Sequence, residues 1–312
     1  MTSNLSSGNP FLDHILQGGY QIGSIILFIE DSPSKISNIF FKYSISESLI
    51  NNQNILYYSQ TKISNLKFFY KSTQIENILN SKNIPKEKEE MKIAWRYENI
   101  NYYNLISEFN NNLKYIFDLS RELQENLYDK NQIKIKNVNY DNLNNFMNVL
   151  VKDINNIEEN NNNNNNMNII KIFINDFMEF VNDFNFNDIK TFLINLKCIG
   201  KCLNGNIFIN IKSNQNKKII NLIKEFTDYN FYIKPLFLLS EKEKIGEYDA
   251  IFSILKLPRI NSLNYNINID CDTFGIIKDK RKIIIEKIDI GVEVDRNTKI
   301  KEFEIKDKNI DF

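Results

Sequence analysis

Short unbroken runs of apolar residues recur along the chain and are separated by stretches with helical spacing. The clearest run, residues 24–30, carries Ile, Leu and Phe at consecutive positions, so both faces of an extended chain would be apolar. Such a run is typical of a strand inside a parallel sheet that helices cover on both sides. The sequence predicts further strands at 55–58, 169–174, 206–211 and 249–256.

Between these runs, apolar residues return at every third or fourth position, as in an amphipathic helix. Leu143, Phe146, Leu150 and Ile154 follow this spacing after Asp141, a residue type that commonly caps a helix N-terminus. Further helices are predicted at 11–16, at 188–202, at 218–226 and from 34–37 onward, where Ile39, Phe40 and Tyr43 share one face.

Strands that alternate with helices predict an α/β fold, here a mainly parallel central sheet flanked by helices. The tail differs, because two short apolar runs at 273–277 and 282–288 are joined by the charged segment 278–281, which predicts an antiparallel C-terminal hairpin. Parallel sheets bind ligands at the carboxyl ends of their strands. We therefore expect any site at the loops after Ile29, Ile174 and Ile211.

The chain of 312 residues is interpreted as a single domain, residues 1–312, because one large sheet can include all the predicted strands. Residues 160–166 are a run of asparagine, which buries too little apolar area to offset its conformational entropy. We expect a disordered insertion without function at 158–168. Residues 62–92 are charged and poorly periodic, so we expect mostly loop with a short helix before Trp95.

The charge is balanced, with 39 Lys and Arg against 39 Asp and Glu, so no overall field draws the protein to nucleic acid or membranes. A free-standing RNA-binding module with a strongly basic face is therefore disfavoured. Three cysteines, an odd number without a framework spacing, indicate a reducing compartment. The N-terminus lacks a signal-peptide pattern, and no apolar run reaches the roughly 20 residues that span a bilayer. The sequence predicts a soluble intracellular protein.

Residues 7–24 resemble the entry to RecA-like ATPases, with Gly8, Leu12-Asp13, Leu16 and Gly18-Gly19 ahead of the first strand. In those enzymes the next loop reads G-x-x-x-x-G-K-[ST], and its backbone N–H groups and lysine hold phosphate.

In this chain the phosphate loop is degenerate. Glu30 replaces the first glycine, Lys35 the second and Ile36 the lysine, so only Ser37 matches. A shift of one residue moves Lys35 to the lysine position but puts Ser34 where glycine is required. Glu30 and Asp31 also place negative charge where phosphate needs positive potential.

The candidate nucleotide site therefore consists of Ser34, Lys35 and Ser37, with Asp176 after the strand where RecA-like enzymes hold magnesium. Aspartate is also common at strand ends because it starts turns, so no metal site is assigned. We expect no autonomous ATP hydrolysis and no cofactor, with ATP binding restricted to a composite subunit interface.

Two other groups of residues carry little chemistry. His14 follows Asp13, but adjacent helical residues point apart and no nucleophile pairs with them, so a hydrolase triad is discarded. Cys198 and Cys202 lack the further ligands that zinc needs and are predicted to be buried as small apolar residues, while Cys271 is unpaired by pattern.

The loop after Ile211 is small and basic, with Lys212, Lys217 and Lys218 around the polar residues 213–216. Its position corresponds to the second central loop of a RecA-like ring, which faces nucleic acid in such assemblies. Lysines there would neutralise phosphates without reading bases. A solvated turn is the alternative in so Lys- and Asn-rich a chain.

Three separated blocks carry a family resemblance. Residues 91–97 hold Trp95, the chain's one tryptophan, beside Arg96; residues 117–121 read Phe-Asp-Leu-Ser-Arg; and residues 257–263 include Arg259. In order and spacing, and with the closing residues 310–312, they resemble the Elongator complex protein 4 family, also called PAXNEB, over nearly the whole length. Trp95 and Arg96 are expected at a subunit interface or in the core, with stacking on a base as the alternative, and Arg259 belongs to a structural block of the family.

The resemblance implies a RecA-like subunit that forms a heterohexameric ring with Elongator proteins 5 and 6. The ring would join the catalytic Elongator subcomplex, bind tRNA and support 5-carbonylmethyl-type modification of the wobble uridine, in the cytoplasm and the nucleus. This chain would be non-catalytic, in keeping with its lack of a cysteine cluster for iron–sulfur ligation. The alternative is a RecA-like ATPase that acts as a motor or as a nucleotide-gated tRNA-release factor.

Overall fold

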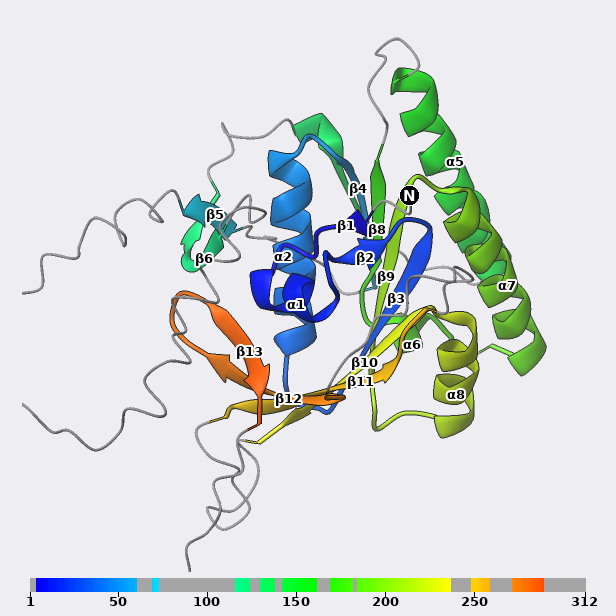
Figure 1. The fold of residues 1–312 in the computed structure, drawn as a ribbon. Helices are drawn as coiled ribbons and strands as arrows, with labels where there is room; N and C mark the ends of the chain where they lie inside the picture. The colour runs from blue at the N-terminus through cyan, green and yellow to red at the C-terminus, as the bar shows by residue number, and fades with distance from the viewer. Residues whose placement is uncertain are drawn as a thin grey trace, which may run out of the picture.

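The computed structural model describes residues 4–60, 69–72, 116–123, 130–137, 142–161, 169–181, 184–236, 248–258 and 271–288 (Figure 1). Within these ranges, nine strands form one sheet in the order β13-β12-β11-β10-β3-β9-β8-β4-β7. They are β3 (Ser24–Glu30), β4 (Asn54–Ser59), β7 (Ile133–Asn137), β8 (Ile170–Ile174), β9 (Gly205–Lys212), β10 (Tyr229–Pro235), β11 (Ala250–Lys256), β12 (Thr273–Lys278) and β13 (Ile283–Lys287). Two small sheets pair β1 (Asn4–Leu5) with β2 (Tyr20–Gln21), and β5 (Phe69–Ser72) with β6 (Ile116–Glu122).

The large sheet is mainly parallel. Every neighbouring pair from β10 through β3, β9, β8 and β4 to β7 is parallel, and in the interior Ile26 of β3 lies opposite Tyr229 on one side and Phe208 on the other. The strands β11, β12 and β13 add an antiparallel end. All residues of β3 are buried, as expected for a strand covered on both faces. The predicted α/β fold, with its parallel sheet and antiparallel C-terminal hairpin, is confirmed.

The strands β7 and β10 were not predicted by the pattern. In β10 the apolar run is broken by Asn230, which is buried. Its amide accepts from Thr227 Oγ1 at 2.5 Å and donates to the Lys224 carbonyl at 3.1 Å, and these bonds offset the cost of burying it. The region 62–92, which was expected to be mostly loop with a short helix, contains the strand β5 at Phe69–Ser72. The remainder of 62–92 lies outside the described residues.

Helices cover both faces of the sheet (Figure 1). The helices α5 (Leu143–Asn161), α6 (Phe177–Val181), α7 (Phe186–Cys202) and α8 (Lys217–Phe226) bury one apolar cluster, and α1 (Pro10–Ile15) and α2 (Ile36–Ile50) bury another on the opposite face. A 3-10 turn, Lys130–Gln132, precedes β7.

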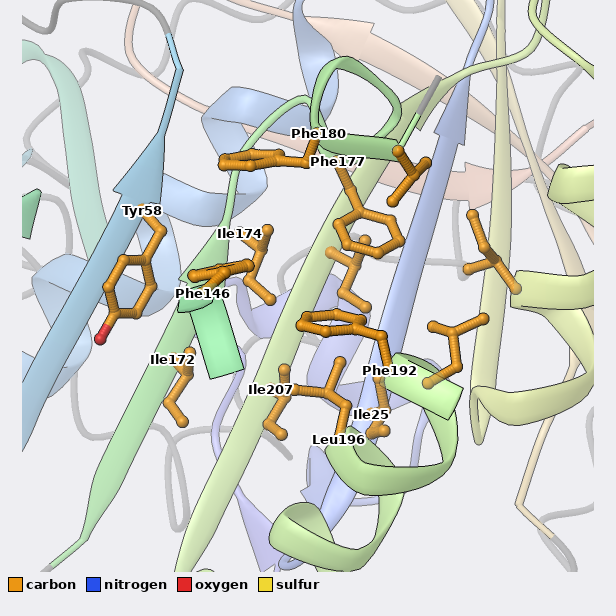
Figure 2. Packing of buried hydrophobic residues seen from close by; sticks show 14 of the residues in the cluster. Ile25, Tyr58, Phe146, Ile172, Ile174, Phe177, Phe180, Phe192, Leu196 and Ile207 are labelled. Carbon is orange, nitrogen blue, oxygen red and sulfur yellow. The ribbon is translucent and has the colours of Figure 1, made fainter. Parts of the chain in front are cut away.

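Phe146 of α5 lies at the centre of the first cluster (Figure 2). Its ring is stacked on Phe180 and Phe192, with centroids 5.3 and 5.5 Å apart, and meets the edge of Tyr58 at 5.3 Å. Aromatic rings in such contacts stabilise the fold by more than the burial of their apolar area alone would. One side chain therefore joins α5, α6, α7 and β4.

On the opposite face, α2 lies between the sheet and the β5–β6 pair. Phe173 and Phe208 stack at 4.7 Å beneath it, and Phe117 of β6 packs on Tyr43 with ring centroids 6.3 Å apart. The backbone nitrogen of Leu119 also donates to the Arg281 carbonyl at 2.8 Å, which connects β6 to the turn of the C-terminal hairpin.

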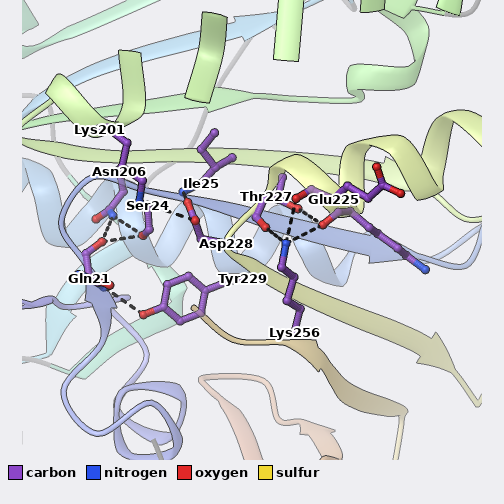
Figure 3. A network of polar contacts seen from close by, with 11 residues as sticks. Gln21, Ser24, Ile25, Lys201, Asn206, Glu225, Thr227, Asp228, Tyr229 and Lys256 are labelled. Carbon is purple, nitrogen blue, oxygen red and sulfur yellow. Dashed lines mark hydrogen bonds and ion pairs between the residues drawn. The ribbon is translucent and has the colours of Figure 1, made fainter. Parts of the chain in front are cut away.

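Polar contacts tie the connections around β3, β9 and β11 (Figure 3). Asp228 accepts a hydrogen bond from the Ile25 nitrogen at 2.9 Å and forms an ion pair with Lys201 at 3.7 Å. Lys256 Nζ donates to the carbonyls of Lys224 and Thr227 at 3.0 and 2.5 Å. A cation there satisfies carbonyls that the end of α8 leaves without partners.

The helix α5 runs further than the pattern predicted. Residues 158–161 of the expected insertion 158–168 are helical, which corrects its start, while residues 162–168 and the expected cap Asp141 lie outside the described residues. Among the helices that the structure describes, none is long and apolar enough to cross a membrane.

Candidate functional site

The side chain of Glu30 closes the loop between β3 and α2. Its carboxylate accepts hydrogen bonds from the backbone nitrogens of Ile36 at 2.6 Å and Ser37 at 3.2 Å, and from Ser37 Oγ at 2.5 Å. Glu30 is only 5% exposed. The first N–H groups of a helix have no partner within it and form the positive end of its dipole, so a carboxylate is stabilising there.

The Glu30 carboxylate thus takes the place that an anionic ligand takes in phosphate-binding loops, where N–H groups at the start of the following helix bind phosphate. In this chain those N–H groups donate to a carboxylate of the protein itself. The sequence predicted only that Glu30 repels phosphate; the structure adds that it occupies the donors that phosphate would need.

The other predicted nucleotide-site residues of this loop lie at its surface. The Ser34 nitrogen donates to the Asp31 carbonyl at 3.2 Å, and Ser34 Oγ lies 3.4 Å from the Ile36 nitrogen. Lys35 is exposed and makes no side-chain hydrogen bond at the start of α2. The structure therefore brings together Ser37 and Glu30, and leaves Lys35 in solvent.

Asn210 of β9 connects the residues that follow β8 to the first turn of α2. Its Nδ2 donates to Asn175 Oδ1 at 2.9 Å and to Asn38 Oδ1 at 2.8 Å, and its Oδ1 accepts from the Asp176 nitrogen at 2.5 Å. Asp176 has φ 52°, a left-handed conformation that aspartate tolerates in turns. Among the described residues, no three His, Cys, Asp or Glu side chains gather as a metal site would require.

Asp31 ties the loops after β3 and β9 to β10. It accepts hydrogen bonds from Tyr232 Oη at 2.7 Å and from Ser213 Oγ. Burial and then the hydrogen bond to Asp31 raise the pKa of Tyr232 to about 12, so the phenol remains a donor at neutral pH.

The three loops expected to form a site do converge. The residues that join them, Asn38, Asn210 and Tyr232, were missed by the sequence analysis. The signal that could have found Asn210 is an amide inside an otherwise apolar strand, because a buried amide needs partners.

One lysine of the basic loop after β9 forms an ion pair with an aspartate. Lys212 Nζ lies 4.0 Å from Asp176 Oδ1. Lys217 and Lys218 are exposed at the start of α8, where the Asn216 side chain accepts from the Lys218 nitrogen at 3.0 Å. Neither of these two lysines forms an ion pair with the part of the chain that the structure describes.

The segment before β3 fastens the N-terminal residues onto α2. Gly8 has φ +82°, and a Cβ there would lie 2.3 Å from the Tyr43 carbonyl oxygen, so only glycine fits. Asp13 accepts from the Ser7 nitrogen at 2.7 Å and from Ser6 Oγ at 2.6 Å. Asp13 therefore has a structural role, and its neighbour His14 is exposed.

Lys171 of β8 is fully buried beneath this segment. Its Nζ donates to the Ser6 carbonyl at 3.2 Å. Burial lowers its pKa from 10.5 to about 8, against the opposite effect of the Glu47 and Asp13 carboxylates.

We expect the substitution Lys171→Met to remove a rise in stability with pH. The folded pKa of about 8 is below the unfolded value of 10.5, so the unfolded chain binds more protons between these values and the free energy of unfolding increases with pH. The gain from about pH 8 to 10 is about 1–2 kcal/mol. Urea unfolding at both pH values measures it, with the exposed Lys152→Met as control. Equal pH dependence in wild type and Lys171→Met would contradict this assignment.

The prediction that Cys198 and Cys202 are buried is wrong, since both are exposed on α7. Leu193 and Leu196 fill the inner face of this helix and leave the cysteines outside. Cys271 is partly buried, and its thiol donates to the Thr273 carbonyl at 2.9 Å.

Of the three signature blocks, residues 117–121 have a visible structural role. Phe117 is fully buried, and Asp118 accepts hydrogen bonds from the Ser120 nitrogen at 2.8 Å and its Oγ at 2.6 Å. Trp95, Arg96, Arg259 and the closing residues 310–312 lie outside the described residues.

Fold and site together define an α/β protein whose strand–loop–helix junction, of the kind that binds phosphate elsewhere, is closed by its own glutamate. The model of the PAXNEB protein family matches residues 2–312. The chain therefore belongs to the PAXNEB family.

Known relatives are similar over parts of the chain. Elongator complex protein 4 of Xenopus laevis is 26% identical over 130 residues, 38% of this chain and 32% of that protein. The Homo sapiens protein of that name is 27% identical over 135 residues, 40% of this chain and 32% of that protein. The Dictyostelium discoideum protein of that name is 24% identical over an alignment that covers 94% of this chain and 76% of that protein. The matched stretch thus spans about a third of the frog and human relatives.

Proposed function

We propose that this chain is a non-catalytic subunit of an Elongator complex. Its membership of the PAXNEB family and its similarity to proteins named Elongator complex protein 4 support this assignment. In the proposal, the chain has a RecA-like frame and forms a heterohexameric ring with Elongator proteins 5 and 6. The ring joins the catalytic subcomplex in the cytoplasm and nucleus, binds tRNA, and supports 5-carbonylmethyl-type modification of the wobble uridine.

The observation that carries the non-catalytic role is the closure of the β3–α2 loop by Glu30. ATP hydrolysis needs backbone donors and a lysine around the terminal phosphates. Here the donors of Ile36 and Ser37 are bonded to a buried carboxylate, and Lys35 lies in solvent. In the proposal, ATP binds only where a neighbouring subunit completes the site.

The tRNA contact is assigned to Lys212, Lys217 and Lys218. Support comes from the exposure of Lys217 and Lys218 beside the carboxyl ends of the strands. Lys212 contributes less, because Asp176 already neutralises part of its charge.

The test is to co-express the chain with the Elongator 5 and 6 subunits of its own organism. We expect a ring that binds tRNA without ATP turnover by this chain alone. Replacing Lys212, Lys217 and Lys218 with alanine should reduce the slope of log affinity against log salt by about 1–3, because each lost phosphate contact removes roughly 0.7–0.9 from it. Gel shifts over a salt series measure the slope.

The matched control removes equal charge elsewhere, by replacing the exposed Lys278, Lys280 and Arg281 of the hairpin turn with alanine. Absence of a ring, or ATP turnover that Lys35→Ala abolishes in the isolated chain, would refute the proposed function. An unchanged salt slope would remove only the lysines from the RNA contact.

A further inference from the structure

An exposed aromatic side chain lies beside the basic loop. Phe186 is the first residue of α7 and is 48% exposed, and it is the aromatic member of the large apolar side chains exposed in the described ranges. With Leu222 and Asn221 of α8 it lines an open hollow of about 290 Å³, to which Lys218 and Glu225 also contribute. About half of this residue's surface stays in solvent, and that half contributes nothing to the stability of the fold.

The hollow carries opposite charges at its two ends, Lys218 and Glu225. Lys218 lines it directly, Lys217 precedes Lys218, and Lys190 lies one turn along α7 from Phe186. All three lysines are exposed. Glu225 is two turns along α8 from Lys218, so the hollow is basic at the start of α8 and acidic further along.

This combination matches single-stranded nucleic acid. Aromatic rings stack on unpaired bases, while lysines at the side neutralise the phosphates between them. A purely apolar partner would bury the charges of Lys218 and Glu225 without giving them new partners. An acidic peptide would pair with Lys218 but would not need a flat aromatic ring.

We propose that Phe186 is a stacking platform for one unpaired base of RNA, with Lys218 on an adjacent phosphate. The inference rests on the proposed function and deepens it, because it assigns to this chain the recognition of an unpaired tRNA segment, which the lysines of the loop alone do not provide.

The experiment uses the assembled ring and a fluorescent RNA hairpin with an unpaired loop of seven bases. Phe186→Ala should weaken binding about 5- to 150-fold, which corresponds to the roughly 1–3 kcal/mol lost per stacked base. Phe186→Trp should retain it. The salt slope should stay unchanged in Phe186→Ala and fall in Lys218→Ala, because stacking releases no counterions. A fully paired RNA duplex should not distinguish Phe186→Ala from wild type.

The matched control is Leu255→Ala, since Leu255 of β11 is 49% exposed and outside the hollow. If wild type binds the hairpin and Phe186→Ala binds equally well, the stacking inference fails and the proposed function stands. If the wild-type ring binds no RNA, both fail. If Phe186→Ala, but not Leu255→Ala, prevents ring assembly, the hollow is a contact between subunits and the RNA inference is overturned.

Discussion

Replacing Phe146 with alanine should lower the free energy of unfolding by about 3–5 kcal/mol, the range for truncating a buried aromatic residue. The side chain is 1% exposed and is the common neighbour of Phe180, Phe192 and Tyr58. Its loss leaves a cavity that α5, α6, α7 and β4 all line, and these elements cannot collapse onto it together. Urea unfolding followed by circular dichroism measures the change.

The control for this variant is Val151→Ala on the same helix. Val151 is 38% exposed, so its truncation removes a few atoms from solvent-facing surface and should change stability by less than about 0.5 kcal/mol. A Phe146→Ala variant as stable as Val151→Ala would show that Phe146 does not hold α5 against the sheet.

The substitution Glu30→Ala should have the second largest effect and should open an anion site. The carboxylate bonds two backbone N–H groups and the hydroxyl of Ser37, all buried, so its removal costs about 2–4 kcal/mol in unfolding free energy. Inorganic phosphate or sulfate should then bind the vacated donors and restore part of the melting temperature, because a ligand that binds the folded state alone stabilises it.

Asp31→Ala is the matched control for Glu30→Ala. It removes an equal charge one residue away, but the partners that Asp31 loses are Tyr232 and Ser213 rather than the start of α2. Thermal melts in phosphate should therefore separate Glu30→Ala from both Asp31→Ala and wild type. If phosphate stabilises all three equally, the carboxylate is not what closes this loop.

The sequence predicted the central strands well because their burial on both faces leaves a simple signal. Strands such as β3 and β8 are apolar at most positions, and their polar residues Ser24, Glu30 and Lys171 do not alternate with the apolar ones. The strand β10 was missed because Asn230 and Lys234 interrupt it, and there pairing partners distant in the sequence outweigh the local pattern. The edge strand β7 was missed although its alternating Ile and Lys are the pattern of a half-buried strand.

The sequence predicted which residues of the candidate site depart from a phosphate loop, but not the contacts that they make. The register of the phosphate loop identified Glu30 as a departure, but a sequence cannot tell whether a carboxylate repels a ligand or replaces it, since that depends on where the side chain turns. The amide contacts of Asn210 with Asn38 and Asn175 join residues 172 and 35 positions apart. Likewise, the exposure of Cys198 and Cys202 depends on which face of α7 packs against the sheet.

The attachment of the C-terminal hairpin to the first residues has a consequence for the order of folding. Asn9 Nδ2 donates to the Ile283 carbonyl at 3.3 Å, and the Ile283 nitrogen donates to Tyr43 Oη at 3.2 Å, across 274 and 240 positions of the chain. Such distant pairings close late and slow folding. A growing chain on the ribosome must therefore wait for β13 before α1 is secured, and in that interval the unfinished edge of the sheet is open to chaperones.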